Sequence, residues 1–355
     1  MTIEQVHPIY PSSLAKELGE YLSGGGWGSD HTKTREFENL IAKEVGTSYC
    51  SVTTSGTQAL IFALMALGVK HGDEVLVPNL TMIATATAVE MVGATPVFVD
   101  VDDTGCISLD AALSKVNRFT KAAIHVSLNG RANNIYRFVQ EMHRIGVPVI
   151  EDACQSLGSK EGNKSIGSFG DIGCFSFSPH KIISTGQGGC SVTSDPALYD
   201  KLRELKDFGR IKGGMDIHPA FGVNGKFSDF LAVVGLSQLR DIENRKMLKQ
   251  DLFQKYYQEL EGVVDFIIPV TDGWVPWFVD IYLDKPDALK AYLADRGIQT
   301  RRMYPILSSQ PIYLGSELTP KAEELAGRGL WLPSSLDLTQ EYILEICKHI
   351  KDFIQ

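Results

Sequence analysis

A regular alternation of short apolar segments and helix-like segments, from about residue 50 to residue 195, constrains the fold more than any other feature. The segments Glu74–Pro78, Pro96–Val101 and Val147–Ala153 are short and apolar almost throughout. Such strands, separated by helices, are typical of a largely parallel, doubly wound α/β sheet with both faces covered. Further helices are predicted over Ser55–Val69, Thr81–Gly93 and Ile135–Ile145, and further strands over Ala122–Leu128, Gly170–Ser178 and Gly188–Asp195.

The alternation of short apolar strands and helices ends after Leu239. A long, charged amphipathic helix is predicted over Arg240–Gly262 as a connector. Strands are predicted over Val263–Pro269 and Trp277–Asp284, and helices over Asp287–Gly297 and Glu341–Ile354. This organisation predicts a large domain over residues 1–240, with an N-terminal arm over residues 1–30, and a smaller α+β domain over residues 241–355.

Composition narrows the classes of function. The chain has 355 residues, a net charge of −9 and no long basic run, which gives no support for a nucleic-acid partner. The amino-terminal segment lacks the pattern of a signal peptide, and no apolar run approaches the roughly 20 residues of a membrane helix. We therefore expect a cytoplasmic protein with no membrane partner. The cysteines lack CxxC pairs and metal-ligand spacing, so we expect reduced core thiols and no metal site.

Two segments place polar side chains at predicted element ends. In Thr53–Leu60, small hydroxyl residues open a helix whose free N–H groups form a cradle for an anion such as phosphate, with a simple helix cap as the alternative. In Val149–Ser156, Glu151 and Asp152 end an apolar strand, where a buried carboxylate needs a partner such as the protonated ring nitrogen of a cofactor. A salt-bridged or solvated strand end is the alternative for these carboxylates.

Lys181 follows the predicted strand that contains Phe175 and Phe177. A lysine in a partly buried pocket has a lowered pKa and becomes a nucleophile for a carbonyl, whereas the alternative is an ordinary surface lysine in a loop. The combination favours the nucleophile. A phosphate cradle, a strand-end aspartate and a lysine 181 − 152 = 29 residues later together meet the requirements of pyridoxal phosphate.

A set of motifs runs in one order along nearly the whole chain. They are GGWGSDHTKTREFENLIAKEVGT, TSGTQAL, GDEVLVPNLTMIATATAVEMVGATPVFVDVD, VIEDACQSLG, FSFSPHKIISTGQGG, FGVNGKFSDFLAVVGLSQL and GIQTRRMYPI. With this set, the sequence resembles the sugar aminotransferases of the DegT/DnrJ/EryC1/StrS family, which are fold-type I pyridoxal-phosphate enzymes. The resemblance implies a large domain with a mostly parallel sheet between helices and a small C-terminal α+β domain.

The resemblance also implies roles for single residues. Lys181 would bind the cofactor covalently and move a proton between cofactor and substrate. Asp152 would pair with the pyridine nitrogen, and Gln155 would lie beside the phenolic oxygen. Asn224 would reach the phosphate of a neighbouring subunit, which implies a homodimer with shared active sites. The other implied phosphate-binding residues are Gly56, Thr57 and Ser176.

The choice between Lys181 and its neighbour His180 follows from spacing. One branch of the family carries histidine in place of the lysine and removes a hydroxyl group instead of transferring an amine. The lysine of the family lies seven positions before the first glycine of the closing pair, and 188 − 7 = 181 in this chain. Lys181 therefore takes the catalytic position, and His180 is expected to line the site or its loop.

The chain departs from the family pattern at three places. Met82 stands where an aromatic residue usually stacks on the cofactor ring, and a thioether packs differently on a ring face. Gln187 stands in place of a usual glutamate. Ser127-Leu128-Asn129-Gly130 stands in place of a usual His-Leu-Tyr-Gly, and Arg131 follows it. These departures concern the stacking on the cofactor and the choice of sugar.

The implied activity is transfer of an amino group from glutamate to a keto group of a nucleotide-diphosphate-linked sugar, in amino-sugar biosynthesis. Ile182–Gly189 is closer to the perosamine-synthase branch, which aminates carbon 4 of a 6-deoxy sugar, than to the carbon-3 branch. Amination at carbon 3, a dehydratase that works from pyridoxamine phosphate, and a non-catalytic sensor are the alternatives. Candidate substrate-binding residues are Trp27, Arg35, Arg131, His180, Lys226, Arg301, Arg302 and Tyr304.

Overall fold

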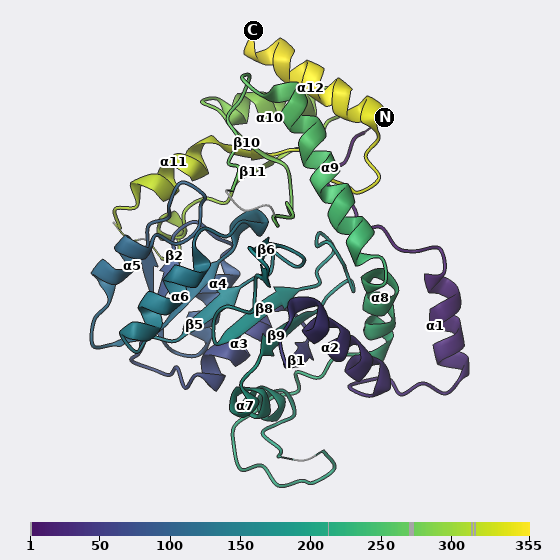
Figure 1. Cartoon of the computed structure of the whole chain (residues 1–355), viewed down its shortest axis with the longest axis vertical. Coiled ribbons are helices and arrows are strands. Elements are labelled where there is room, and N and C mark those ends of the chain that lie inside the picture. The colour runs from purple at the N-terminus through teal and green to yellow at the C-terminus, as the bar shows by residue number, and fades with distance from the viewer. Residues whose placement is uncertain (1, 212, 270–272, 314, 316) are drawn as a thin grey trace.

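The computed structural model describes residues 2–211, 213–269, 273–313, 315 and 317–355. Figure 1 shows a large sheet unit and a smaller unit, with the long helix α9 (Ile242–Leu260) running between them. Both ends of the chain lie at the smaller unit (Figure 1). Within the described residues, every helix is too short or too polar to cross a membrane.

The bounds of the elements are as follows. The other helices are α1 (Leu14–Ser23), α2 (Thr32–Val45), α3 (Gly56–Ala66), α4 (Ala84–Met91), α5 (Leu109–Lys115), α6 (Ile135–Arg144), α7 (Pro196–Lys206), α8 (Asp229–Leu239), α10 (Pro286–Ala294), α11 (Pro320–Arg328) and α12 (Gln340–Ile354), with short 3-10 helices at Leu128–Gly130 and Leu307–Ser309. The strands are β1 (Tyr49–Thr53), β2 (Glu74–Pro78), β3 (Thr95–Val99), β4 (Thr120–Val126), β5 (Val149–Asp152), β6 (Lys160–Glu161), β7 (Lys164–Ser165), β8 (Ile172–Ser176), β9 (Gly189–Thr193), β10 (Asp280–Tyr282), β11 (Arg301–Arg302) and β12 (Gly329–Trp331).

The large sheet has seven strands in the order β1-β9-β8-β5-β4-β2-β3. β9 runs antiparallel to both of its neighbours, whereas all pairs from β8 to β3 are parallel. The predicted, largely parallel sheet is therefore confirmed, and β1 is a strand that the sequence analysis missed. Because β1, β5 and β8 run in the same direction, their carboxyl ends lie at one edge of the sheet, where ligands bind in folds of this kind.

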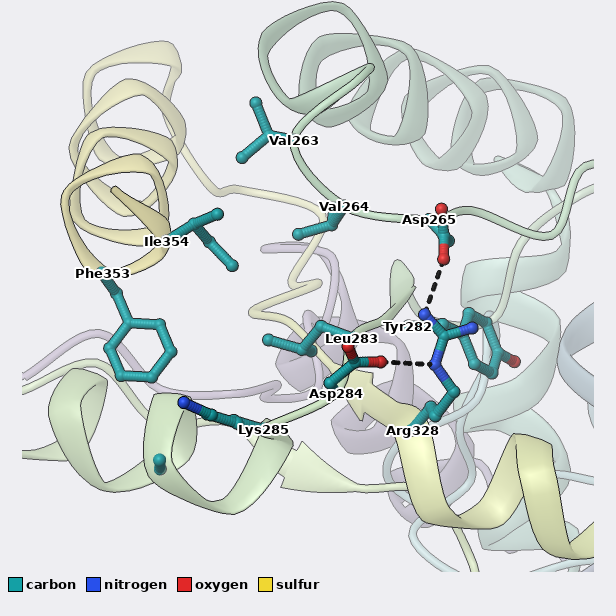
Figure 2. A pocket seen from close by; sticks show the side chains of 11 residues that line it. Val263, Val264, Asp265, Tyr282, Leu283, Asp284, Lys285, Arg328, Phe353 and Ile354 are labelled. Atoms are coloured by element: carbon teal, nitrogen blue, oxygen red, sulfur yellow. Dashed lines mark hydrogen bonds and ion pairs between the residues drawn. The ribbon is translucent and has the colours of Figure 1, made fainter.

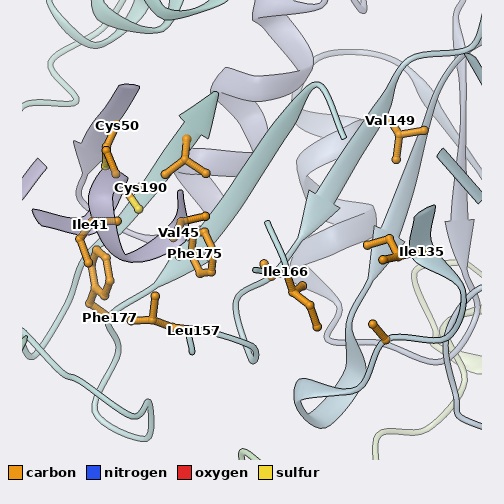
Figure 3. Close-up of a cluster of buried hydrophobic side chains, with 14 of the residues drawn as sticks. Ile41, Val45, Cys50, Ile135, Val149, Leu157, Ile166, Phe175, Phe177 and Cys190 are labelled. Carbon is orange, nitrogen blue, oxygen red and sulfur yellow. The ribbon is translucent and has the colours of Figure 1, made fainter. Parts of the chain in front are cut away.

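Helices cover both faces of this sheet (Figure 1). On one face α2, α5, α6 and α8 pack on a buried apolar cluster, and Figure 3 shows Phe175 and Phe177 of this cluster near Ile41 and Val45 of α2. On the other face α3, α4 and α7 enclose a second cluster that includes Leu60. Helix α3 is apolar on nearly every side because it lies between the sheet, α4 and α7.

The smaller unit contains an antiparallel sheet in the order β10-β12-β11 and the helices α10 and α12, which pack with α9 around their own apolar cluster. The start of the chain packs on this unit, since Ile3 belongs to its core and pairs with Ile298. The boundary at residue 240 stays a prediction. In space, however, the first residues of the predicted arm lie with the C-terminal part.

The predicted strand over Val263–Pro269 is wrong. This segment forms only single bridges, at Val264 and Asp265. Its apolar side chains serve another purpose, because the ring of Phe266 packs against the aromatic side chains of α9, Phe253 among them. An apolar run of this length is therefore explained by core packing without a strand.

Gly189 allows the close contact between β9 and the amino end of α3. A Cβ atom at this position would lie 2.4 Å from the backbone nitrogen of Gly56, closer than real Cβ contacts. We expect Gly189→Ala to lower the free energy of unfolding by about 2 kcal/mol, a common cost of overpacking a core. Urea denaturation followed by circular dichroism measures this change.

Gly19→Ala is the matched control for that substitution. Gly19 lies inside α1, and nothing lies within 4 Å of a Cβ atom built there. Alanine at this position should stabilise the protein by about 0.5–1 kcal/mol, because glycine is a poor helix former. Equal effects of the two substitutions would contradict the close contact at Gly189.

Candidate active site

A cavity of about 330 Å³ lies at the carboxyl ends of β1, β5 and β8. It is bounded by the amino end of α3, the end of β5, the segment after β8 and two segments of the smaller unit. The cavity brings together all predicted cofactor-binding residues except Asn224, namely Gly56, Thr57, Met82, Asp152, Gln155, Ser176 and Lys181. It also contains the predicted substrate-binding residues His180, Arg301 and Tyr304, and the departure Gln187.

A larger cavity, of about 620 Å³, lies in the smaller unit and is shown in Figure 2. Its lining is partly apolar, with Val264 and Ile354 facing it, and its Arg328 is paired with Asp265 and Asp284. None of the predicted site residues lines it. Since its arginine is paired with two carboxylates and every predicted catalytic residue lies in the smaller cavity, we assign the chemistry to the smaller cavity.

The amino end of α3 forms the predicted anion cradle. Ser55 caps the helix, and its Oγ accepts a hydrogen bond of 3.1 Å from the backbone N–H of Gln58. The N–H groups of Gly56 and Thr57 have no partner within the helix and are available to a ligand. Ser176 lies against this turn, because a Cβ atom at Gly56 would lie only 3.0 Å from the Ser176 Cβ. Free N–H groups and a hydroxyl therefore converge on one place.

The two carboxylates at the end of β5 have different surroundings. Asp152 lines the cavity, and its Oδ2 accepts a hydrogen bond of 2.8 Å from the Thr85 hydroxyl. Glu151 is fully buried away from the cavity, where the N–H groups of Gly167 and Gly170 donate to it. Burial raises the pKa of Glu151 to about 7, against these hydrogen bonds. Asp152 is therefore the candidate partner for a ring nitrogen, and Glu151 fixes the turn before β8.

Lys181 follows β8 and lines the cavity. Its Nζ lies 3.8 Å from the centre of the Trp277 ring, in a cation–π contact. Burial lowers the pKa of Lys181 to about 8; nearby Asp152 opposes this shift and Arg301 reinforces it. A substantial fraction of Lys181 is consequently a neutral amine near physiological pH, which is the form that attacks a carbonyl.

Trp277 is a site residue that the sequence analysis missed. Its Nε1 donates a hydrogen bond of 2.7 Å to the His180 carbonyl, and its own carbonyl accepts one of 2.9 Å from the buried Lys249. No sequence signal marks it, because only the docking of the smaller unit brings it to Lys181. The sequence analysis also missed Thr85. The one feature of the sequence that could have indicated it is a threonine on the buried side of a helix.

Arg131 does not fit the predicted role as a substrate ligand. Its side chain is fully buried, and its Nη1 lies 2.8 Å from Asp280 Oδ2. The guanidinium also donates to the Thr104 carbonyl. With its donors used inside the protein, Arg131 has no face toward a substrate, and its role is to join the two units.

The remaining candidates lie outside this cavity. Arg35 pairs with Glu38 and Arg302 with Asp287. Lys226 pairs with Asp207, and Asn224 lies on the surface nearby.

Trp27 is 66% exposed, although the loop that carries it is held in place. Asp229 accepts hydrogen bonds from the N–H groups of His31 and Lys33 and from the Tyr21 hydroxyl, which itself lies 2.8 Å from the Trp27 carbonyl. A large apolar ring on a fixed loop, with little of its own chain against it, is suited to contact another molecule. Its substrate role stays a prediction.

Comparison with known proteins identifies the family to which the chain belongs. Residues 12–351 match the sequence model of the DegT/DnrJ/EryC1/StrS aminotransferase family. The chain belongs to this family. It is similar to GDP-perosamine synthase of Escherichia coli O157:H7, at 34% identity over 98% of both chains. It is also similar to the UDP-N-acetyl-3-dehydro-alpha-D-glucosamine 3-aminotransferase of Acidithiobacillus ferrooxidans, at 36% identity over 89% of this chain and 87% of the relative.

A solved structure agrees with this assignment. The chain is similar to a DegT DnrJ EryC1 StrS aminotransferase from Brucella abortus, with a TM-score of 0.90 and 31% identity over 96% of this chain and 95% of that chain. The predicted family, fold and activity, a pyridoxal-phosphate-dependent sugar aminotransferase, are thereby confirmed.

The cavity of this family member fits pyridoxal phosphate. The α3 cradle and Ser176 suit its phosphate, Asp152 suits its ring nitrogen, and Lys181 suits its aldehyde. When bound, the cofactor supplies an electron sink for cleavage of a bond to the substrate carbon. The protein must supply the anchor for the phosphate, the acid partner and the amine, and all three meet in one cavity.

The lowered pKa of Lys181 predicts how its reaction with added pyridoxal phosphate depends on pH. Because the neutral amine is the nucleophile, the rate of cofactor uptake by the apoprotein should rise with pH, reach half of its maximum near pH 8 and level off above that. Borohydride trapping at a series of pH values, followed by peptide mass spectrometry, measures the reaction at Lys181. A midpoint at the ordinary lysine pKa would contradict the prediction.

Arg301→Gln provides a second measurement on the same amine. Arg301 is one of the groups that lower the pKa of Lys181, so its removal should move the midpoint upward. Arg144→Gln is the matched control, since Arg144 is a surface residue paired with Glu141 on α6, and it should leave the midpoint in place.

Proposed function

We propose that this enzyme transfers the amino group of glutamate to the keto carbon of a nucleotide-diphosphate-linked 4-keto-6-deoxy sugar, in amino-sugar biosynthesis. One observation carries the proposal. Lys181, with its lowered pKa, shares a cavity with Asp152 and with the anion cradle of α3. An intact lysine and a complete set of cofactor-binding groups favour amino transfer over dehydration and over a non-catalytic sensor.

Each group in the cavity has a defined task in this proposal. Asp152, held by the Thr85 hydroxyl, keeps a proton on the ring nitrogen of the cofactor. The α3 cradle and Ser176 would anchor the phosphate, and Met82, which also lines the cavity, would pack on the ring in place of an aromatic side chain. Lys181 would bind the cofactor, would be freed when the amino donor takes its place, and would then deliver a proton to the sugar carbon that receives the amine.

Arg301 and Tyr304 are the proposed substrate contacts. The guanidinium of Arg301 is exposed and lies 5.6 Å from the Tyr304 ring centre. Arginine suits both a donor carboxylate and a diphosphate. His180 is exposed beside them, and partial burial with the charges of Lys181 and Arg301 lowers its pKa. This shift favours the neutral imidazole of His180, which suits a hydrogen-bonding group in the site.

Carbon 4 is favoured by two observations. The similarity to GDP-perosamine synthase of Escherichia coli O157:H7 covers 98% of both chains. Ile182–Gly189, which follows the lysine, is also of the perosamine-synthase type. Carbon 3 is the second candidate, because the similarity to the 3-aminotransferase of Acidithiobacillus ferrooxidans reaches 36% identity.

We also propose a homodimer in which Asn224 and Trp27 serve the partner's site. Neither residue lines the cavity of its own chain. A largely apolar groove of about 550 Å³ lies beside α3, with the exposed side chains of Met91 and Phe221 at its walls, and it suits a second copy of the chain. We place the enzyme in the cytoplasm, where six free cysteines stay reduced.

A panel of substrates tests the proposed reaction. Purified enzyme with glutamate and nucleotide-linked 4-keto and 3-keto sugars should yield an amino-sugar, read by mass, from a 4-keto sugar. Lys181→Ala should abolish the product, because the amine that moves the proton is gone. Amination of only 3-keto sugars would select the second candidate. Amination of none, by an enzyme that binds the cofactor, would overturn the proposed acceptor.

Mixing two inactive variants tests the shared site. Each proposed site takes Lys181 from one subunit and Asn224 from the other. Lys181→Ala removes the first contribution, and Asn224→Asp disrupts the second because the aspartate repels the phosphate held by the partner. A mixed dimer retains one intact site, so unfolding and refolding the two variants together should restore up to about a quarter of wild-type activity. Lys181→Ala mixed with Asp152→Asn is the control, because both residues belong to one subunit and no intact site forms. Equal results from both mixtures would rule out sharing through Asn224.

A further inference from the structure

Asn129 is fully buried at the junction between the two units. Its backbone is left-handed, with φ 54° and ψ 33°, a conformation that asparagine adopts more readily than most residues. Every polar atom of Asn129 has a hydrogen-bond partner. A buried polar side chain that is fully satisfied has one well-defined position.

The side chain of Asn129 is clamped to the smaller unit. Its Oδ1 accepts a hydrogen bond of 2.7 Å from the Phe278 N–H, and its Nδ2 donates to the Phe278 carbonyl at 2.9 Å. The same Nδ2 donates to Asp280 Oδ1 at 2.8 Å. Asp280 is fixed in turn by Arg131 and by the Tyr282 hydroxyl. These contacts leave the peptide of Asn129 little freedom to rotate.

The backbone of Asn129 acts on the cavity through Gln155. Its N–H lies 2.7 Å from Gln155 Oε1. A backbone N–H can only donate, so the Gln155 atom that faces it is the oxygen, and Nε2 is turned to the other side. Gln155 lines the cavity, and no described residue accepts a hydrogen bond from its Nε2. The arrangement leaves a donor free for a ligand.

We propose that Asn129 is a positioning residue that turns Gln155 so that its Nε2 donates to the phenolic oxygen of the bound cofactor. This inference rests on the cofactor site proposed above and extends it to a residue outside the cavity. A hydrogen bond donated to the phenolic oxygen stabilises its negative charge. The oxygen then attracts less strongly the proton held at Lys181 Nζ, and that proton is lost at lower pH.

The test is the pH titration of the visible absorbance of the holoenzyme, which follows the proton at Lys181 Nζ without any sugar. Asn129→Gly removes every side-chain clamp but imposes no strain on the left-handed backbone. Asn129→Ser is a second variant that keeps a hydroxyl. Gln155→Leu removes the donor itself. Thermal unfolding of each variant is measured alongside, because loss of the clamps lowers stability in any case.

We expect Gln155→Leu to raise the titration midpoint by about one pH unit, the order expected for a lost hydrogen bond to a charged group. Asn129→Gly and Asn129→Ser should raise it in the same direction. Gln155→Leu should add little in the Asn129→Gly background, since both act through one donor. A folded Asn129 variant with a lowered melting temperature but an unchanged midpoint would overturn the proposal.

Failure of the sugar assignment is distinguishable from failure of this inference. A wild-type enzyme that binds the cofactor at Lys181 but aminates no sugar leaves the titration fully measurable. Asn133→Gly is the matched control, because Asn133 lies four positions along the same segment and bonds Asp102 on the surface. It should leave the midpoint unchanged.

Discussion

The site depends on the direction in which three strands run. β1, β5 and β8 end at one edge of the sheet, so the helix cap at Ser55, the carboxylate of Asp152 and the hydroxyl of Ser176 meet there although they are far apart in sequence. β9 runs the other way and returns the chain between β1 and β8, and its first residue, Gly189, packs against the start of α3. A side chain at that point would push the helix from the sheet and open the cradle. The anion site therefore rests on backbone packing as much as on its polar groups.

Lys181 and Asp152 share one cavity but need opposite protonation behaviour for the proposed chemistry. An amine must give up its proton to react, whereas the carboxylate must stay charged to hold a proton on a ring nitrogen. Burial favours the neutral amine, and the positive charge of Arg301 adds to this effect. Asp152 has a hydrogen-bond partner in the same surroundings, because the Thr85 hydroxyl donates to it. The neighbours of the two groups therefore differ: burial and Arg301 act on the amine of Lys181, whereas a hydroxyl donates to Asp152.

The sequence was sufficient for the parts of the site that lie on the large sheet. Apolar periodicity located α3, β5 and β8, and the ends of these elements carry Gly56, Asp152 and Ser176. Arg131 and Trp277 could not be placed in the same way. Their roles depend on how the smaller unit docks, which buries the arginine against Asp280 and brings the tryptophan ring to Lys181. The strand predicted over Val263–Pro269 was wrong for a related reason, because a short apolar run that packs on an aromatic cluster cannot be told from a buried strand by periodicity alone.

The departures at Asn129 and Arg131 have one physical explanation. Both residues bond the carboxylate of Asp280, and all three side chains are fully buried. A buried ion pair offsets its desolvation only when the remaining polar atoms are also satisfied, so the loss of one of these partners would leave a buried charge uncompensated. Asn129 and the Tyr282 hydroxyl supply the missing hydrogen bonds to Asp280. Asn129 and Arg131 therefore both hold Asp280, and Asn129 also bonds the backbone of Phe278, next to the tryptophan that contacts Lys181.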